Sequence, residues 1–251
     1  MAKQKGIIKL KGTMGDVTFY RTRDGYLARE KGGIDRQRIM NDPAFQRTRE
    51  NGMEFGTACK GGQLLRKALR QPLKLAKDGR VTSRLVKVMM EIVKTDAVSE
   101  RGHRKIQEGN MGFLEGFDFN NRGKLNTVFF SGYTPSFDRG TGLYELDVEE
   151  FVPNDTIDAP KGTTHIQLVA GVCALDFENR SFESDHELSA IIPWDHQSQP
   201  ALTLSSSVSG GGTLPVVQVA GVNFFQEVNG EMYALRNGVF NALAVVGIDQ
   251  V

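Results

Sequence analysis

Residues 165–192 read HIQLVAGVCALDFENRSFESDHELSAII, and this stretch decides the fold class of the chain. Its β-branched and apolar residues do not recur at helical spacing, and the polar pair Asn179 and Arg180 suits a hairpin turn. We therefore predict strands on both sides of that turn. The expected ranges are residues 165–173, 174–178, 181–185 and 187–192.

The same pattern of short apolar and β-branched runs continues in both directions through the C-terminal part of the chain. Asn229 and Gly230 favour a tight hairpin turn, because both residue types tolerate the positive φ angles that such a turn requires. Short runs between regularly spaced turns are typical of an antiparallel β-sandwich. Further strands are expected at residues 127–130, 144–148, 201–205, 214–225, 231–235 and 242–246.

The N-terminal residues predict a small β-sheet. Residues 17–21 and 26–30 are rich in β-branched and aromatic side chains and should pair as a hairpin. Asp24 and Gly25 form the expected turn between them. Residues 7–10 should add a third strand, and a sheet of this size needs a packing partner because it buries little by itself.

A helical segment follows the sheet. Asn41 and Asp42 offer a capping side chain, and Pro43 is well placed at a first helical position, where its missing N–H is harmless. The predicted helices cover residues 43–69, then 81–97 with Asp78 as the cap, and 99–109. The side chains expected in the core from the first helix are Phe45, Phe55, Ala58, Leu65 and Leu69.

Four glycines inside the first predicted helix require an explanation. Gly52, Gly56, Gly61 and Gly62 each weaken a helix by roughly 1 kcal/mol relative to alanine. Gly52 and Gly56 lie one turn apart and would let another backbone approach closely. Alternatively, the helix breaks near Gly61 and Gly62.

These elements together predict an α+β fold. It comprises an N-terminal β-hairpin or small sheet, a central α-helical segment and a C-terminal antiparallel β-sandwich. By composition the chain divides into a basic hairpin-plus-helices region, residues 1–111, and an acidic β-sandwich domain, residues 112–251.

Charge is distributed very unevenly along the chain, although the formal net charge is only +1. Residues 1–110 hold 25 Lys and Arg against 12 Asp and Glu, whereas residues 111–251 hold 6 against 18. Such asymmetry points to partner binding. Three interpretations are open. In the first, the two halves neutralise each other within one chain. In the second, the basic half of one copy meets the acidic half of the next in a ring or filament, and in the third the basic half binds nucleic acid.

The basic residues near the N-terminus form the candidate interface. They are interleaved with Phe19, Tyr20, Tyr26 and Phe45, and cations with aromatics suit phosphates and bases. The same guanidinium groups make bidentate contacts with carboxylates, and the acidic half would repel a polyanion. The candidate interface consists of Arg21, Arg23, Arg29, Lys31, Arg36, Arg38, Arg47, Arg49, Gly52 and Gly56.

Four segments carry a resemblance to a known group of proteins. They are KLKGTMGDVTFY (residues 9–20), TRDGYLAREKGG (residues 22–33), NDPAFQRTRENGMEFG (residues 41–56) and FFQEVNGEMYAL (residues 224–235). The chain resembles, through most of its length, an uncharacterised family of Bacteroidota proteins with a basic strand-and-helix N-terminal half and a β-sandwich-like C-terminal half. The resemblance implies a bacterial, cytoplasmic origin and brings no activity, because that family has no assigned function.

The sequence contains no motif for catalysis or for binding a metal or cofactor. His186 and His196 lie near Asp185, Glu187 and Asp195, but among strands and turns and without the i, i+4 spacing of a helical metal site. No serine stands in the nucleophile pattern of a hydrolase. We therefore expect no enzymatic activity, no catalytic or metal-binding residue, no cofactor and no small-molecule substrate.

Other features favour a cytoplasmic protein. Cys59 and Cys173 are the only cysteines, and they are far apart in the sequence. The first residues lack the apolar core of a secretory signal, and no window approaches the roughly 20 apolar residues of a membrane helix. No membrane partner is expected.

The leading hypothesis is a structural protein whose copies associate through their oppositely charged halves, as part of a fibre, tube or shell. The glycine face of the first helix, or strand addition at the N-terminal sheet, would supply the apolar contact that lasting assembly needs. The alternative is a nucleic-acid-associated protein that binds phosphates through the basic half.

Overall fold

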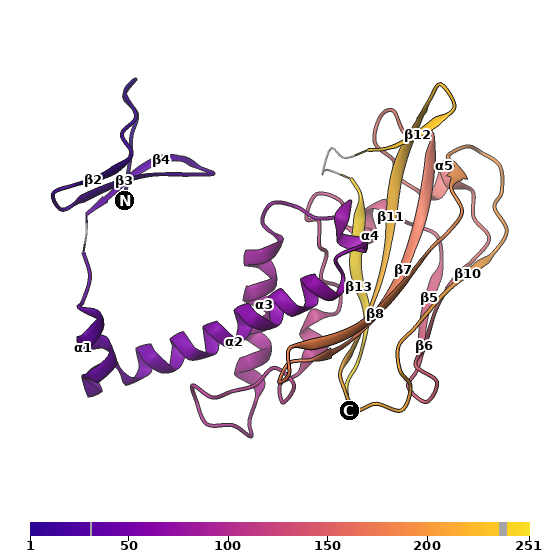
Figure 1. Ribbon diagram of the computed structural model, residues 1–251. Helices are drawn as coiled ribbons and strands as arrows, with labels where there is room; N and C mark the ends of the chain where they lie inside the picture. Colours follow the sequence, from indigo (N-terminus) through magenta and orange to yellow (C-terminus); the bar gives the residue numbers. More distant parts are fainter. Residues whose placement is uncertain (31, 236–239) are drawn as a thin grey trace. The chain divides into compact units, whose positions relative to one another are not determined.

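The computed structural model describes residues 1–30, 32–235 and 240–251 of the chain. It divides into two compact units, Met1–Glu50 and Asn51–Val251. The predicted α+β class is confirmed: a small N-terminal sheet is followed by central helices and by C-terminal antiparallel sheets (Figure 1).

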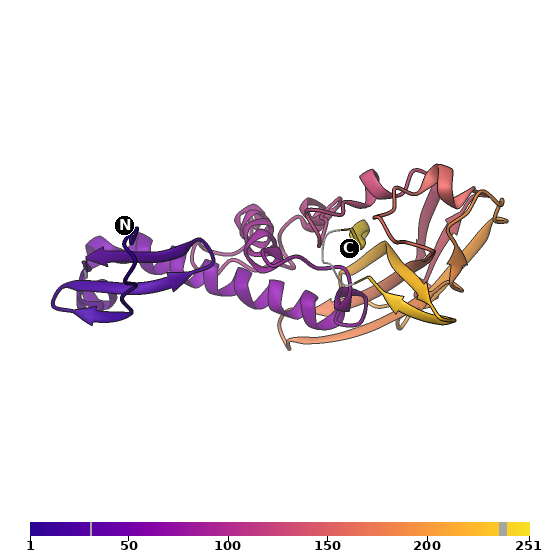
Figure 2. The ribbon, with the colours of Figure 1, turned by 90° about the horizontal axis from the view of Figure 1, so that it is seen from above.

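The N-terminal unit contains a four-stranded antiparallel sheet, whose strands lie side by side in Figure 2. Across the sheet the order is β1-β4-β3-β2, with β1 (Ala2–Lys3), β2 (Gly12–Met14), β3 (Val17–Thr22) and β4 (Gly25–Glu30). The predicted hairpin is confirmed. Its turn differs in detail, because Thr22 pairs with Gly25 and the positive φ of 115° lies at Gly25.

The strand predicted at residues 7–10 is wrong. These residues form no strand, and the side chains of Ile7 and Ile8 are exposed. The short strands β1 and β2 form the edges of the sheet instead. Apolar residues gain strand structure only where a neighbouring strand and a surface to pack on receive them, and Ile7 and Ile8 have neither within the described residues of this sheet.

Two of the three predicted helices are confirmed within a few residues. The helical elements of this region are α1 (Arg36–Asn41), η1 (Pro43–Phe45), α2 (Gln46–Ala68), η2 (Pro72–Lys74) and α3 (Val81–Thr95). Asp42 caps the turn that Pro43 opens, and its carboxylate accepts a hydrogen bond from the N–H of Ala44 at 2.9 Å. Asp78 does not cap α3, because the N-cap residue is Arg80. Asp78 lies two residues before Arg80, and its carboxylate accepts a hydrogen bond from the Arg80 N–H.

The four glycines of α2 have two different environments. The helix does not break at Gly61 and Gly62, where neighbouring side chains approach instead. A Cβ on Gly61 would lie 2.1 Å from Cδ1 of Ile106. At Gly52 and Gly56 an added Cβ meets nothing within 4 Å. Close approach within the chain therefore explains Gly61, but it does not explain Gly52 or Gly56.

Most of the core residues predicted for α2 are correct. Ala58, Leu65 and Leu69 are buried, whereas Phe45 is half-buried. The prediction for Phe55 is wrong, because its side chain is 54% exposed.

The helix predicted at residues 99–109 is wrong, because the segment after α3 is organised by a buried carboxylate. Asp96 is 1% exposed and accepts hydrogen bonds from the backbone N–H groups of Val98, Ser99 and Lys105 at 2.8–3.0 Å. Burial by itself would raise the pKa of Asp96, but the hydrogen bonds from Lys105, Ser99 and Val98 outweigh it and lower the pKa to about 2. N–H groups bound to a carboxylate are not available to a helix.

The C-terminal unit contains two antiparallel sheets. One has the order β10-β6-β5, with β5 (Tyr133–Asp138), β6 (Leu143–Val148) and β10 (Leu202–Ser207). The larger sheet has the order β12-β11-β7-β8, with β7 (His165–Asp176), β8 (Ser181–Leu188), β11 (Val216–Val228) and β12 (Glu231–Ala234). Two further strands belong to it: β9 (Ile192–Pro193) pairs with β7, and β13 (Ala242–Asp249) pairs with β11. Short helices η3 (Met111–Leu114), α4 (Leu125–Val128) and α5 (Pro153–Thr156) connect the sheets to the rest of the unit.

The predicted strands of this unit are largely correct, with four differences. The strands predicted at residues 165–173 and 174–178 form one continuous strand, β7, which ends at Asp176. The strand predicted at residues 187–192 is wrong, because residues 187 and 188 end β8 and only Ile192 belongs to β9. Residues 127–130 are not a strand, because α4 ends among them. Strand β5 was not predicted, since Pro135 interrupts its alternating pattern and proline is compatible only with an edge strand such as this one.

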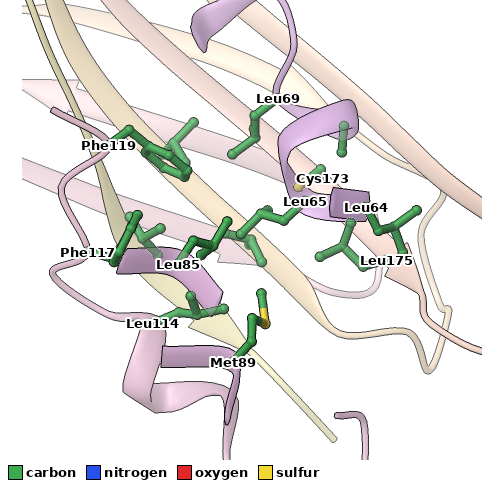
Figure 3. Close-up of a cluster of buried hydrophobic side chains, with 14 of the residues drawn as sticks. Leu64, Leu65, Leu69, Leu85, Met89, Leu114, Phe117, Phe119, Cys173 and Leu175 are labelled. Atoms are coloured by element: carbon green, nitrogen blue, oxygen red, sulfur yellow. The ribbon is translucent and has the colours of Figure 1, made fainter. Parts of the chain in front are cut away.

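Strands β7 and β11 are buried on both faces. Figure 1 shows α2 and α3 on one side of the larger sheet and the strands β5, β6 and β10 on the other. On the helix side, Cys173 lies in a cluster with Leu65 and Leu85, which point toward one another in Figure 3. On the other side, Val172 belongs to the second core together with Tyr144. The first core therefore joins the helices to the sheet, so the division at residues 111 and 112 separates compositions and not cores.

Two carboxylates connect the edges of the two sheets. Asp185 of β8 accepts the backbone N–H of Ser207 at 3.0 Å, and Glu187 accepts that of Ser205. Both donors belong to the edge strand β10. The carboxylates thus satisfy backbone groups that a further strand would otherwise bind.

Asp96 should make stability depend on pH in the acid range. Its pKa is lower in the folded than in the unfolded protein, so the unfolded chain takes up the proton first as the pH falls. The ionised carboxylate therefore contributes about 2 kcal/mol above about pH 4, and this is lost between about pH 4 and pH 2. Urea unfolding should show Asp96→Asn about 2 kcal/mol less stable than wild type at neutral pH, with the difference vanishing near pH 2. A difference that stays constant with pH would contradict this role.

Substitution of the α2 glycines by alanine should change the free energy of unfolding in different directions at different positions. Gly52→Ala and Gly56→Ala should each raise the free energy of unfolding by up to about 1 kcal/mol, because the new methyl group meets nothing. Gly61→Ala, the matched control in the same helix, should be less stable than Gly52→Ala by about 1–3 kcal/mol, since Ile106 must shift. Urea unfolding at high salt measures all three. Equal stabilisation at positions 52 and 61 would be inconsistent with this packing.

Candidate assembly interface

The predicted interface residues lie on three parts of the chain. On the β3–β4 hairpin are Arg21, Arg23 and Arg29; on α1 are Arg36 and Arg38; on α2 are Arg47, Arg49, Gly52 and Gly56. Lys31 lies outside the described residues.

Two arginines of the hairpin are held over tyrosine rings. The guanidinium carbon of Arg21 lies 5.5 Å from the ring centre of Tyr26, and that of Arg29 lies 5.6 Å from the ring centre of Tyr20. Both arginine side chains are exposed. Cation–π contact orients each guanidinium group while leaving its N–H donors free to bind an anion.

Three other arginines make contacts within their own unit. Arg38 forms an ion pair with Asp42 at 3.3 Å, and Arg47 forms one with Glu50 at 3.1 Å. Arg49 donates to two backbone carbonyl groups at 2.7 and 3.0 Å. Of the three, Arg49 links the start of α2 to α1. Because all three are engaged within their own unit, Arg21 and Arg29 are the stronger candidates for binding a partner.

The two faces of the N-terminal sheet differ in chemistry. Residues paired across the strands share a face, and successive residues alternate. One side, the basic face, carries Lys3, Thr13, Thr18, Tyr20, Thr22, Leu27 and Arg29. The opposite side, the apolar face, carries Ala2, Met14, Val17, Phe19, Arg21, Tyr26, Ala28 and Glu30. Within residues 1–30, all of which the structure describes, no side chain is buried.

The C-terminal unit has a face of the opposite charge. The outer side of the three-stranded sheet, the acidic face, carries Thr134, Ser136, Asp138, Leu143, Glu145, Asp147, Thr203, Ser205 and Ser207. Hydrogen bonds from the Thr141 hydroxyl and the Gly140 N–H lower the pKa of Asp138, which keeps it ionised. Between residues 125 and 160 the single Lys or Arg is Arg139, and its guanidinium is paired with Asp249 at 2.9 Å.

Sequence reasoning assigned the negative charge to the C-terminal half but missed this face. The available signal was the alternation of residues 144–148, Tyr-Glu-Leu-Asp-Val, which places apolar side chains inward and carboxylates outward. Tyr144, Leu146 and Val148 are buried, as that alternation requires.

Gly52 and Gly56 lie on a side of α2 that no other described residue covers within 4 Å of an added Cβ. The neighbouring side chains Met53 and Phe55 are exposed large apolar groups. Two helical glycines without an internal packing role, beside an exposed aromatic ring, fit a surface against which another backbone packs.

No three His, Cys, Asp or Glu side chains among the described residues are grouped to hold a metal ion. His186 alternates with Asp185 and Glu187 along β8, so its side chain lies on the opposite face of the sheet from theirs. His196 lies 3.3 Å from Asp155 instead.

One pocket among the described residues borders α2 and is small. It has a volume of about 160 Å³ and is lined by Thr57, Lys60, Gly61, Leu64, Ile106, Phe177, Glu178 and Arg180. Ligand sites are commonly about 300–1,000 Å³. Its carboxylate, Glu178, is paired with Lys105 at 2.7 Å. The helices of the described residues include none with the length and apolarity needed to span a bilayer.

Comparison with known proteins adds little to this geometry. No family model and no curated protein matches the chain. A solved chain from a structure described as "pH-induced modulation of Streptococcus parasanguinis adhesion by Fap1 fimbriae" is 12% identical, over 51% of this chain and 93% of that chain, with a TM-score of 0.20. A TM-score of this size supports no conclusion about the fold or function of the present chain.

Proposed function

We propose that this is a non-enzymatic structural protein that self-assembles, as a component of a fibre, tube or shell, through contacts between its basic N-terminal and acidic C-terminal halves. The observation that carries the proposal is the N-terminal sheet, whose strands contain no buried side chain. Ordering the backbone costs about 1–2 kcal/mol per residue, and a sheet without a core does not recover that cost. A partner surface would supply what the sheet lacks.

The charges of the two units suggest where copies meet. Residues 1–50 hold 12 Lys and Arg against 6 Asp and Glu. The basic face of the N-terminal sheet carries Lys3 and Arg29, whereas the acidic face carries Glu145 and Asp147 and no cation among its strand residues. Arginine binds carboxylates through paired hydrogen bonds, so the two faces are complementary.

A contact between different surfaces of two copies can repeat. Each copy would offer its basic face to one neighbour and its acidic face to another, and such heterologous contacts close into a ring or continue as a filament. Charge mainly sets the register and the association rate of such a contact. The hydroxyl-rich surroundings on both faces would add hydrogen bonds at the same contact.

We further propose that the protein acts in the bacterial cytoplasm. Cys59 and Cys173 are both free thiols, which suits a reducing compartment. Cys173 is buried, which raises the pKa of its thiol to about 12 and makes it unreactive.

Salt should disperse the assemblies. Light scattering of the purified protein should detect large particles at low salt that shrink above physiological ionic strength, where charges are screened beyond about 8 Å. Glu145→Lys combined with Asp147→Lys should abolish the large particles at low salt. Glu100→Lys with Glu108→Lys makes the same change of charge in the segment after α3 and should leave them intact. A wild type that is small at every salt concentration would rule out the proposed function.

The alternative function is nucleic-acid binding, and one observation favours it: guanidinium groups stacked on Tyr20 and Tyr26 resemble the cation and aromatic pairs that hold single strands. Filter binding to random duplex DNA across a salt series distinguishes nucleic-acid binding from self-assembly. Each phosphate that the protein neutralises adds about −0.9 to the slope of log affinity against log salt. We expect Lys3→Glu with Arg29→Glu, which reverses the charge of the basic face, to abolish assembly. If that variant assembles normally but loses salt-dependent nucleic-acid binding, the alternative is correct.

A further inference from the structure

We propose that the apolar face of the N-terminal sheet packs against the same face of a second copy, so that two sheets form a small sandwich around a two-fold axis. This dimer contact is distinct from the contact between basic and acidic faces and does not depend on it. The occupant of the apolar face is therefore the N-terminal unit of another copy of this chain.

The faces of the sheet, and not its edges, are available for such a contact. The edge strands β1 and β2 contain two and three residues, so strand addition would gain few backbone hydrogen bonds. The apolar face instead presents a row of half-buried side chains, Val17, Phe19 and Ala28, beside Met14, which is 67% exposed. Two such faces bury one another as the inner faces of a sandwich do.

The charges on this face indicate that its partner is an identical face. Arg21 lies at the turn end of the hairpin, where it pairs with Tyr26, and Glu30 lies at the open end, where it pairs with Val17. Phe19 and Ala28 occupy the middle. The face therefore runs from positive through apolar to negative along the strand direction.

A face with this pattern complements itself in only one of two orientations. A two-fold axis perpendicular to the strands, between the stacked sheets, places Arg21 of each copy over Glu30 of the other. A two-fold axis parallel to the strands places Arg21 over Arg21 and Glu30 over Glu30, which repel. The charges thus select an isologous dimer with opposed hairpins, and Tyr26 holds the Arg21 guanidinium in place at 5.5 Å.

Charge exchange tests the dimer directly. In the Glu145→Lys, Asp147→Lys background, which removes the contact of the acidic face, sedimentation at low salt should give a dimer. Adding either Arg21→Glu or Glu30→Arg should weaken dimerisation at least roughly tenfold, because like charges then face each other. Combining Arg21→Glu with Glu30→Arg reverses the pattern but keeps it self-complementary, and should restore dimerisation to within about threefold of the background.

Two controls make the outcome decisive. Arg29→Glu makes the same change of charge beside a tyrosine, but on the basic face, and should leave the dimer intact. Phe19→Ser should abolish the dimer. If Phe19→Ser unfolds the sheet, it does not test the contact, and the combined exchange of Arg21 and Glu30 then provides the test. A combined exchange that fails to restore the dimer overturns the proposal, as does a background protein that is monomeric or that gains mass only when nucleic acid is added.

The two proposals fail in different ways. A wild type that forms large particles, with a background variant that is monomeric, removes the dimer and leaves the assembly function standing. A wild type that is a dimer at every salt concentration removes the assembly function and leaves the dimer.

Discussion

The antiparallel pairing of β7 with β11 is the interaction on which the C-terminal unit depends. Ten residues of each strand are in register, from Val216 opposite Ala174 to Phe225 opposite His165. Because both strands are buried on both faces, their side chains contribute to two separate cores, one packed against the helices and one packed against the smaller sheet. A packing change in one core that displaces these strands would therefore also affect the other core.

The N-terminal sheet is built on the opposite principle. Its strands are paired in a defined antiparallel register, yet no side chain in residues 1–30 is buried. Backbone hydrogen bonds alone add little net stability, since the unfolded chain makes equivalent bonds with water. The sheet thus has a defined register and two chemically distinct faces, but it lacks the apolar burial that makes such a register stable.

Sequence patterns located most elements because local rules and tertiary packing agree there. Asn229 and Gly230 have φ angles of 54° and 81°, as the predicted hairpin turn requires. The pattern failed where a distant contact decided the outcome. Phe55 has the period of a core residue but faces away from the core, and Asp96 collects N–H groups that would otherwise suit a helix. The arginines of the interface were recognisable by type, but only the strand register separates Arg21 from Arg29 onto different faces.

A protein that assembles through chosen faces must also limit contact through its sheet edges, and three edges of the C-terminal unit, those of β10, β5 and β13, are blocked in different ways. Asp185 and Glu187 occupy N–H groups of β10, and Pro135 lies in the other edge strand of that sheet. Strand β13 is covered by backbone hydrogen bonds from residues 116–119, including Phe119 N–H to the Leu243 carbonyl at 2.8 Å. The contacts that we propose therefore use the faces and not these three edges. Faces carry side chains and not backbone groups, so charge pattern and shape, which the sequence can vary residue by residue, determine which copies meet.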